Sequence, residues 1–277
     1  KESALGNLAL AMKLPPEAML QGLSEVLKGA GRRAERRLPH ALRSQMRRRL
    51  DREPVTPGFG QTRWGDLRRT APVERYFGYT RGKPVDRHYI EDFLARHSAD
   101  IAGRVLEVGD NGYTMRFGGA RVTRSDVLHI SAHAPNATIV GDLANADHIP
   151  DATFDCFVLT QTLQMIFDMP AAIRTIHRIL RPGGVVLITV PGISQIDQDD
   201  WRDTWYWSLT AAALRRLLAQ GWTQLSVETQ GNVLSAVAFL HGITTGELTP
   251  DEMAVRDEAY PVIVAARAVK PGPETSR

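Results

Sequence analysis

The side chains best suited to acid–base chemistry lie between residues 75 and 91, where aromatic, basic and acidic residues are unusually dense. Asp86 and His88 are of the types that take a proton from a hydroxyl group, and Arg87 and Tyr89 can hold an oxygen-rich molecule beside them. This segment is therefore a candidate for proton transfer from a bound hydroxyl. The alternative is that Asp86 only caps the helix that follows it.

A second set of candidate residues lies at residues 103–114, where an apolar strand with an acid, Glu107, leads directly into a glycine turn. Gly109 allows the backbone to turn sharply at the strand's carboxyl end. Gly112 removes a side chain where a ligand would touch the main chain. This pattern predicts the start of a nucleotide-binding crevice.

Further acids and strands follow at regular intervals. The next strand, at 121–128, is expected to end at Asp126, where a carboxylate about 20 residues after the glycine turn accepts the hydroxyls of a ribose. Asp142 ends a third short strand, and 154–160 and 185–190 are the fourth and fifth. Five strands that alternate with helical segments predict an α/β fold with a doubly wound sheet.

At these positions the chain resembles the class I S-adenosylmethionine-dependent methyltransferases, over about residues 85–270, and in particular the bacterial enzymes associated with glycan or natural-product assembly. The resemblance rests on Val-Leu-Glu107-Val-Gly109, on Asp126 and Asp142, and on the Leu-Arg-Pro-Gly-Gly run at 180–184. It implies a Rossmann-like, mostly parallel sheet with an antiparallel edge strand, and S-adenosyl-L-methionine as the cofactor. The cofactor residues it implies are Arg81, Glu107, Gly109, Asp110, Gly112, Asp126, Asp142, Leu143, Thr160 and Gln161.

The chain departs from the family pattern in two places. The glycine turn lacks the second and third of the family's three alternating glycines, because Asn111 and Tyr113 stand at those positions, and Asp110 is therefore expected to contact the cofactor's amino group. The segment between the first two strands, 111–120, is short, which predicts an abbreviated helix. His129 and His133 follow the expected ribose acid, and we expect them near adenine or solvent.

The acceptor side of the site is expected in two segments. Asp86 or His88 is the candidate base, with Arg87 and Tyr89 as acceptor contacts. The cluster at 197–208 follows the fifth strand, and ligands bind outside the carboxyl ends of parallel strands. Its candidate acceptor contacts are Asp200, Trp201 and Trp205; the alternative is that these aromatic residues hold the next helix on the sheet. An insertion at 231–258 either walls the acceptor pocket or forms a dimer surface.

Charge divides the chain into parts. Residues 28–52 hold ten Lys or Arg against two acids, whereas the net charge of the whole chain is +3. We expect a basic helical arm at 1–52, a linker and lid at 53–84, the catalytic domain at 85–270 and a flexible tail at 271–277. The basic segment either contacts an anionic membrane surface, grips phosphates, or packs on the domain or on a second subunit.

Composition excludes several classes of function. The single cysteine, Cys156, cannot form an internal disulfide, and the eight histidines lack metal-ligand spacing, so no metal is expected. No apolar run approaches the ~20 residues of a membrane helix, which favours a cytoplasmic location, with or without peripheral membrane contact. Together with the resemblance to the methyltransferases, this leads us to expect O-methylation of a sugar, glycan or natural-product small molecule. The alternatives are an RNA methyltransferase, although nucleic acid is the less favoured partner, and a non-catalytic binding protein.

Overall fold

The computed structural model describes residues 56–272. The chain divides into two units at Asp66 and Leu67. Described residues 56–66 of the first unit contain only the start of a 3-10 turn, η1 (Gly65–Leu67). Residues 67–272 hold the sheet and the other helices. The predictions for the basic arm at 1–52 and for most of the tail fall outside the described residues.

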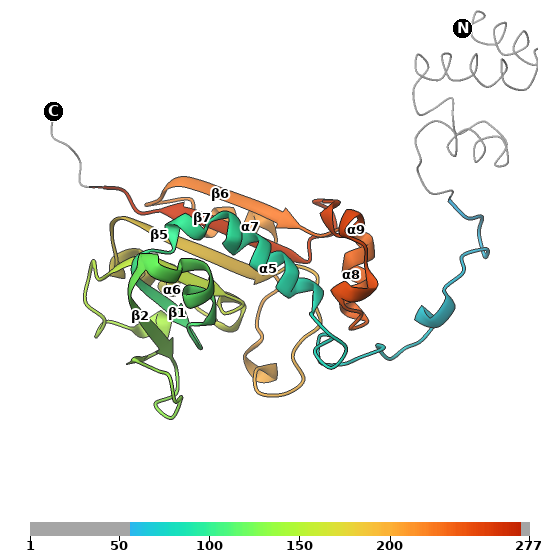
Figure 1. Cartoon of the computed structure of the whole chain (residues 1–277), viewed down its shortest axis with the longest axis horizontal. Helices are drawn as coiled ribbons and strands as arrows, with labels where there is room; N and C mark the ends of the chain where they lie inside the picture. The colour runs from blue at the N-terminus through green and yellow to red at the C-terminus, as the bar shows by residue number, and fades with distance from the viewer. Residues whose placement is uncertain (1–55, 273–277) are drawn as a thin grey trace, which may run out of the picture. The chain divides into compact units, whose positions relative to one another are not determined.

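A seven-stranded sheet forms the centre of the second unit (Figure 1). Its strands, in the order β3-β2-β1-β4-β5-β7-β6, are parallel except for β7, which runs antiparallel to β5 and β6. This confirms the Rossmann-like fold and the antiparallel strand near one edge. The bounds are β1 Gly103–Val108, β2 Val122–His129, β3 Ile139–Val140, β4 Phe154–Thr160, β5 Leu180–Pro191, β6 Thr223–Gln230 and β7 Ile263–Val269.

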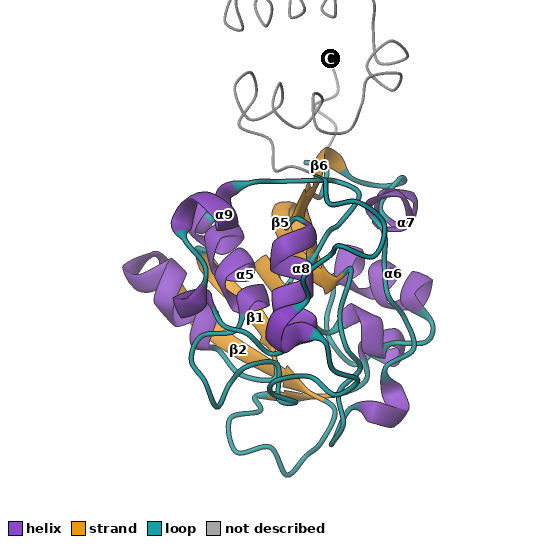
Figure 2. Ribbon diagram, turned by 90° about the vertical axis from the view of Figure 1, so that its right-hand side faces the viewer, coloured by secondary structure: helices purple, strands orange, loops and turns teal. Residues whose placement is uncertain are grey.

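Helices cover both faces of the sheet (Figure 2). On one face α5 (Val85–Arg96), α8 (Val233–Leu240) and α9 (Pro250–Ala254) pack over alternate strand residues such as Val105, Val158 and Leu187. On the other, α6 (Met169–Ile179) and α7 (Ala211–Leu217) cover the intervening residues, among them Leu106 and Leu159. Successive side chains of a strand point to opposite faces, so each buried strand contributes to both cores.

Short turns make up the remaining helical structure. Between β1 and β2 the crossover is only a π-helical turn, η3 (Thr114–Gly118), and a 3-10 turn, which confirms the abbreviated helix. The 3-10 turns of the second unit are η2 Ser98–Asp100, η4 Gly119–Arg121, η5 Leu143–Asn145, η6 Leu163–Met165, η7 Arg202–Thr204 and η8 Thr245–Glu247. Within the described residues, no helix is both long enough and apolar enough to span a bilayer.

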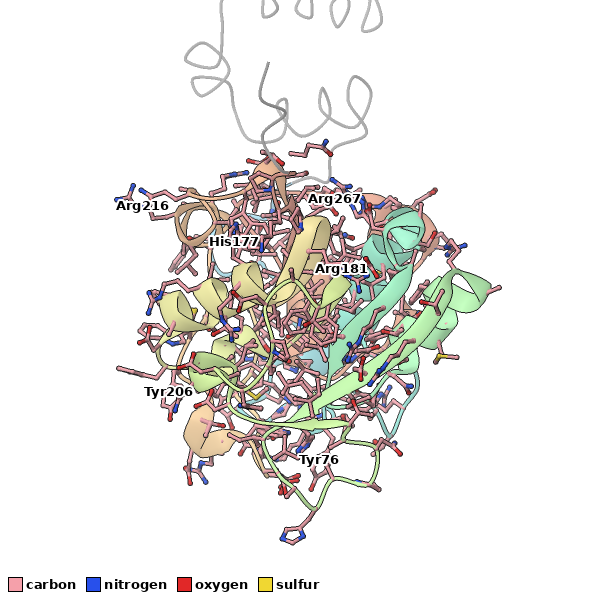
Figure 3. All side chains as sticks on the ribbon, turned by 90° about the vertical axis from the view of Figure 1, so that its left-hand side faces the viewer. Tyr76, His177, Arg181, Tyr206, Arg216 and Arg267 are labelled. Atoms are coloured by element: carbon pink, nitrogen blue, oxygen red, sulfur yellow. The ribbon has the colours of Figure 1, made fainter. Side chains whose placement is uncertain are left out.

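The order of the strands reverses between β1 and β4, because the chain first builds outward through β2 and β3 and then returns to add β4 and β5. Ligands of open α/β sheets bind at such a switch point, beyond the carboxyl ends of the strands. Figure 3 shows Tyr76 and Tyr206 in the lower half of the molecule and Arg181, near the start of β5, in the upper half.

Candidate active site

A cavity of about 710 Å³ lies at the switch point and is called here the cofactor cavity. Its walls come mainly from strand ends, and its volume is in the range of small-molecule sites, roughly 300–1,000 Å³. The ends of four strands and the turns after them contribute: β1 and its turn (Glu107, Val108, Gly109, Asp110), β2 and its turn (Leu128, His129, Ile130), the turn after β3 (Gly141, Asp142, Leu143, Ala144), and β4 and its turn (Thr160, Gln161, Thr162).

The end of β1 forms the base of the cofactor cavity. The carboxylate of Glu107, which is 2% exposed, accepts hydrogen bonds from the backbone N–H groups of Tyr113 (3.3 Å) and Thr114 (2.7 Å). These bonds hold the glycine turn in place. Burial raises the pKa of Glu107 to about 7 despite them. Gly109 has φ +89°, and a Cβ there would meet only open space, so the turn leaves its backbone accessible to a ligand.

The end of β2 differs from the sequence prediction. Asp126 lies mid-strand opposite Leu106, three residues before β2 ends, and it does not line the cavity. Its carboxylate is 1% exposed and is bonded by the guanidinium groups of Arg104 (2.7 Å) and Arg124 (3.2 Å). Burial alone would raise the pKa of Asp126, but the two arginines lower it. Asp126, predicted as the ribose acid, is thus held in a buried ion pair, and the strand ends at His129.

The segments after β3 and β4 place the other predicted residues. Asp142 and Leu143 line the cavity, with the Asp142 side chain accepting a hydrogen bond from the Ala144 N–H at 2.9 Å. Gln161 has a left-handed backbone, φ +47°, fixed by its N–H bond to the Thr189 carbonyl (2.8 Å). Its buried amide nitrogen, Nε2, has no hydrogen-bond partner among the described residues. Backbone strain of this kind is concentrated at functional sites.

These residues fit the expected S-adenosylmethionine. The accessible glycine turn suits the close approach of a ligand to the main chain, and the unpartnered Gln161 amide offers a donor. Gly112 lies outside the main cavity, in a side pocket of about 460 Å³ that shares Arg87, Asp110 and Tyr113 with it. The cofactor roles of the lining residues stay predictions.

A second cavity of about 370 Å³, called here the acceptor cavity, adjoins the first. The two share Arg87, Gln161, Met165 and Trp201. The predicted residues Asp86, Asp200 and Trp205 line it as well. Trp205 stacks on Phe77, with ring centroids 6.4 Å apart and ring planes 16° apart. The alternative role of holding the next helix belongs to Trp207, which packs on the core and donates to the Ile166 carbonyl.

Asp86 and Arg87 form the polar centre of this arrangement. Asp86 is 6% exposed, and burial raises its pKa even though the Arg87 guanidinium lies 3.7 Å away. Pro84, not Asp86, occupies the N-cap of α5, but an Asp86 carboxylate oxygen accepts a hydrogen bond from the first-turn N–H of Arg87 at 2.7 Å. Arg87 donates to the hydroxyls of Tyr79 (2.8 Å) and Tyr113 (3.4 Å), which holds its guanidinium where the cavities meet.

Besides Asp126 and Gly112, three more predicted residues line neither cavity. Arg81 instead pairs with Glu247 at 2.8 Å. His88 lies two residues after Asp86 on a helix, a rotation of about 200°, and its ring packs against Tyr89. Tyr89 is 2% exposed in the core and donates to the Met253 carbonyl at 3.3 Å. Their predicted roles, cofactor binding for Arg81, general base for His88 and acceptor contact for Tyr89, stay predictions.

Several lining residues were missed by the sequence analysis. Gln164 is 1% exposed at the acceptor cavity, and its Oε1 has no hydrogen-bond partner among the described residues. Tyr76, Phe77 and Tyr79 belong to the dense aromatic run that the sequence did display, whereas Phe239 comes from α8. The insertion therefore walls the acceptor cavity, as one of the two alternatives predicted.

The segment 74–83, called here the strap, is tied to the loop that follows α8. The Glu74 N–H donates to the His241 carbonyl and the Thr245 N–H to the Lys83 carbonyl, each at 3.0 Å. A Cβ on Gly78 would lie 3.0 Å from the Gly242 carbonyl oxygen, so glycine permits the close approach of the two segments. The strap and α8 thus close the acceptor cavity together.

Comparisons with known proteins agree with this architecture. A family model described as a methyltransferase domain matches residues 82–231. A probable S-adenosylmethionine-dependent methyltransferase of Mycolicibacterium smegmatis is 29% identical over 201 residues, 72% of this chain and 71% of that protein. A ubiquinone/menaquinone biosynthesis C-methyltransferase of Pasteurella multocida is 30% identical over 99 residues, 35% of each chain. The N-methyltransferase NodS of Bradyrhizobium japonicum, solved with S-adenosyl-L-homocysteine, superposes with TM-score 0.46 at 15% identity, covering 70% of this chain and 91% of that one.

Proposed function

Because the chain belongs to the methyltransferase-domain family, as a class I S-adenosylmethionine-dependent methyltransferase, we propose that it methylates a hydroxyl group of a sugar, glycan or natural-product small molecule. The names of similar proteins do not identify the acceptor atom, since one is named for methylation of carbon and another for methylation of nitrogen. The chemistry of the acceptor cavity supports oxygen.

The observation that carries the proposal is the buried carboxylate of Asp86 in the acceptor cavity. A hydroxyl must lose its proton as it becomes methylated, whereas many other acceptors need no base. Burial raises the pKa of Asp86 toward the range in which a carboxylate accepts a proton effectively. Asp86 is therefore proposed as the general base, in place of His88.

The unpaired polar atoms and the aromatic rings of the cavity walls support a hydroxyl-rich or flat acceptor. Gln161 Nε2 and Gln164 Oε1 are a donor and an acceptor without partners among the described residues, and buried polar atoms left unpaired cost about 1–3 kcal/mol each. A substrate hydroxyl would satisfy Gln164 Oε1, which lines only the acceptor cavity, whereas Gln161 Nε2 is proposed to face the cofactor. The stacked Phe77 and Trp205 rings supply the apolar wall against which the ring of a sugar or polyketide packs.

Each part of the site then has a role. When bound, S-adenosylmethionine supplies an electrophilic methyl group on its sulfonium. The turn at Gly109 and the side chains of Asp142 and Gln161 would hold the cofactor, and Arg87, which lines both cavities, suits its carboxylate. Asp86 takes the proton from the acceptor hydroxyl, and the aromatic walls exclude water from the reacting groups. Holding the two reactants together supplies much of the rate.

The test begins with calorimetric titration of the full chain with S-adenosylmethionine and S-adenosylhomocysteine. Release of S-adenosylhomocysteine is then followed with a panel of methyl glycosides, nucleotide sugars and polyketide phenols, beside amines of similar size. Turnover with hydroxyl acceptors that Asp86→Asn abolishes supports the proposal. Turnover confined to amines, or unaffected by Asp86→Asn, contradicts it.

A further inference from the structure

The end of β2 carries a histidine where a ribose-binding carboxylate is expected. In dinucleotide-type crevices a carboxylate about 20 residues beyond the first glycine turn binds the ribose hydroxyls. His129 stands 20 residues beyond Gly109 in the sequence. It is the last residue of β2, and it lines the cofactor cavity.

The sheet register places His129 beside the glycine turn. Leu128 pairs with Val108, and the Gly109 N–H donates to the Leu128 carbonyl at 3.0 Å, so the next residue of β2 lies at the level of the turn. The nearest acid in the strand, Asp126, is fully engaged by Arg104 and Arg124 away from the cavity.

The imidazole of His129 is held in one orientation. Its Nδ1 accepts a hydrogen bond from the Ser131 N–H at 2.9 Å, and its backbone carbonyl accepts one from the Gly141 N–H at 3.0 Å. A nitrogen that accepts an N–H bond carries no proton, so the proton of the neutral ring is on Nε2. Nε2–H is therefore a donor with a fixed direction.

We infer that His129 binds the ribose of the methyl donor, and that its Nε2–H donates to a ribose oxygen where a carboxylate would accept from one. The inference rests on the proposed use of the cofactor cavity and names the residue that recognises the sugar there. The direction of the hydrogen bond is also reversed, because the protein donates the hydrogen and the ribose oxygen accepts it. Asp126 then has a structural role only.

The test compares two ligands on the full chain by calorimetry. These are S-adenosylhomocysteine and its analogue that lacks both ribose hydroxyls. The native protein should bind S-adenosylhomocysteine roughly 5- to 30-fold more tightly than the analogue, the usual cost of losing such a bond. His129→Ala should bring the two affinities together by weakening only S-adenosylhomocysteine, and His129→Asn, which keeps an N–H donor, should retain part of the preference.

Two matched variants separate this role from a structural one. His133→Ala removes an exposed histidine of the same loop that does not line the cavity, and it should change neither affinity. Asp126→Asn should lower the melting temperature but keep the preference for the ribose hydroxyls. Equal affinity of the native protein for both ligands, or a preference lost in Asp126→Asn and kept in His129→Ala, overturns the inference while leaving the methyltransferase proposal intact. Absence of any S-adenosylhomocysteine binding overturns both.

Discussion

The cofactor cavity and the acceptor cavity meet at Arg87 and Gln161, but their walls are built differently. The first is lined mainly by the ends of neighbouring strands, whose positions the hydrogen-bonded ladder of the sheet fixes. The second is closed by the strap, by Phe239 of α8 and by the loop after β5, which side-chain packing and a few backbone bonds hold together. The acceptor side can therefore change its chemistry while the donor side is kept. Four substitutions test whether the two sides are separable.

The largest effect is expected from Asp86→Asn on the acceptor side. Loss of a general base should lower kcat/KM for a hydroxyl acceptor by about 10²- to 10⁴-fold and leave the Kd of S-adenosylhomocysteine unchanged. The ionised carboxylate is the active form, so the rate of the native enzyme should rise with pH through the raised pKa of Asp86, and the variant should lose this rise. A parallel loss of cofactor affinity would show that the two sides are coupled.

The pH dependence of stability tests the role of Glu107 at the floor of the cofactor cavity. Its pKa is about 7 in the folded chain against an ordinary value of 4.5, so the fold binds a proton that the unfolded chain releases. This contribution to the free energy of unfolding is present below pH 4.5 and is lost as pH rises through 7, a difference of about 3 kcal/mol. Urea unfolding at pH 5 and pH 8 should show a decline in the native protein that Glu107→Gln lacks. An identical pH dependence in both proteins would contradict the assignment.

Gly109→Ala tests the turn on the donor side. At φ +89° a residue with a Cβ is strained, which should cost about 1–2 kcal/mol of stability and weaken S-adenosylhomocysteine further, because the new methyl group enters the cavity. Thermal melting and calorimetry measure the two effects. Gly112→Ala is the matched control, since Gly112 does not have a positive φ, and it should cost much less stability.

The smallest effect is expected from Trp205→Ala. Removal of one face of the acceptor cavity should raise the acceptor KM by several-fold, an aromatic contact being worth about 0.5–1.5 kcal/mol, without changing cofactor affinity. Trp207→Phe is the control in the same loop: it should lower the melting temperature, through lost core packing and the lost bond to Ile166, and leave the acceptor KM alone. The reverse pattern would exchange the roles of the two tryptophans.

The donor side was largely predictable because it follows from strand periodicity and glycine turns. The strand at Phe154–Thr160 was predicted to the residue, and Gly109, Asp142 and Gln161 line the cavity as expected. The position of Asp126 was harder to predict because its carboxylate was taken to mark the strand's end, whereas β2 continues through the buried Val127 and Leu128 to His129. Arginines at 104 and 124 were the overlooked sign of a paired, buried carboxylate.

The acceptor side was predicted less completely, for a physical reason. Phe77 and Phe239 are 5.9 Å apart between ring centroids, yet they are separated by most of the domain in sequence. Periodicity specifies which face of an element is buried but not which distant element covers it. The ion pair of Arg81 could not be predicted for the same reason, because its partner, Glu247, belongs to the loop after α8.

The hydrogen bonds between the strap and the loop after α8 make these two segments structurally dependent on each other. A designer who wishes to transplant the acceptor preference of this enzyme onto a relative must move residues 74–83 and 233–247 together. The strap alone would lose the carbonyl of His241 and the N–H of Thr245 as partners, and the close contact of Gly78 with Gly242. Chimaeras that exchange both segments should fold and carry the new preference, whereas exchanges of either one should yield an open, unselective pocket.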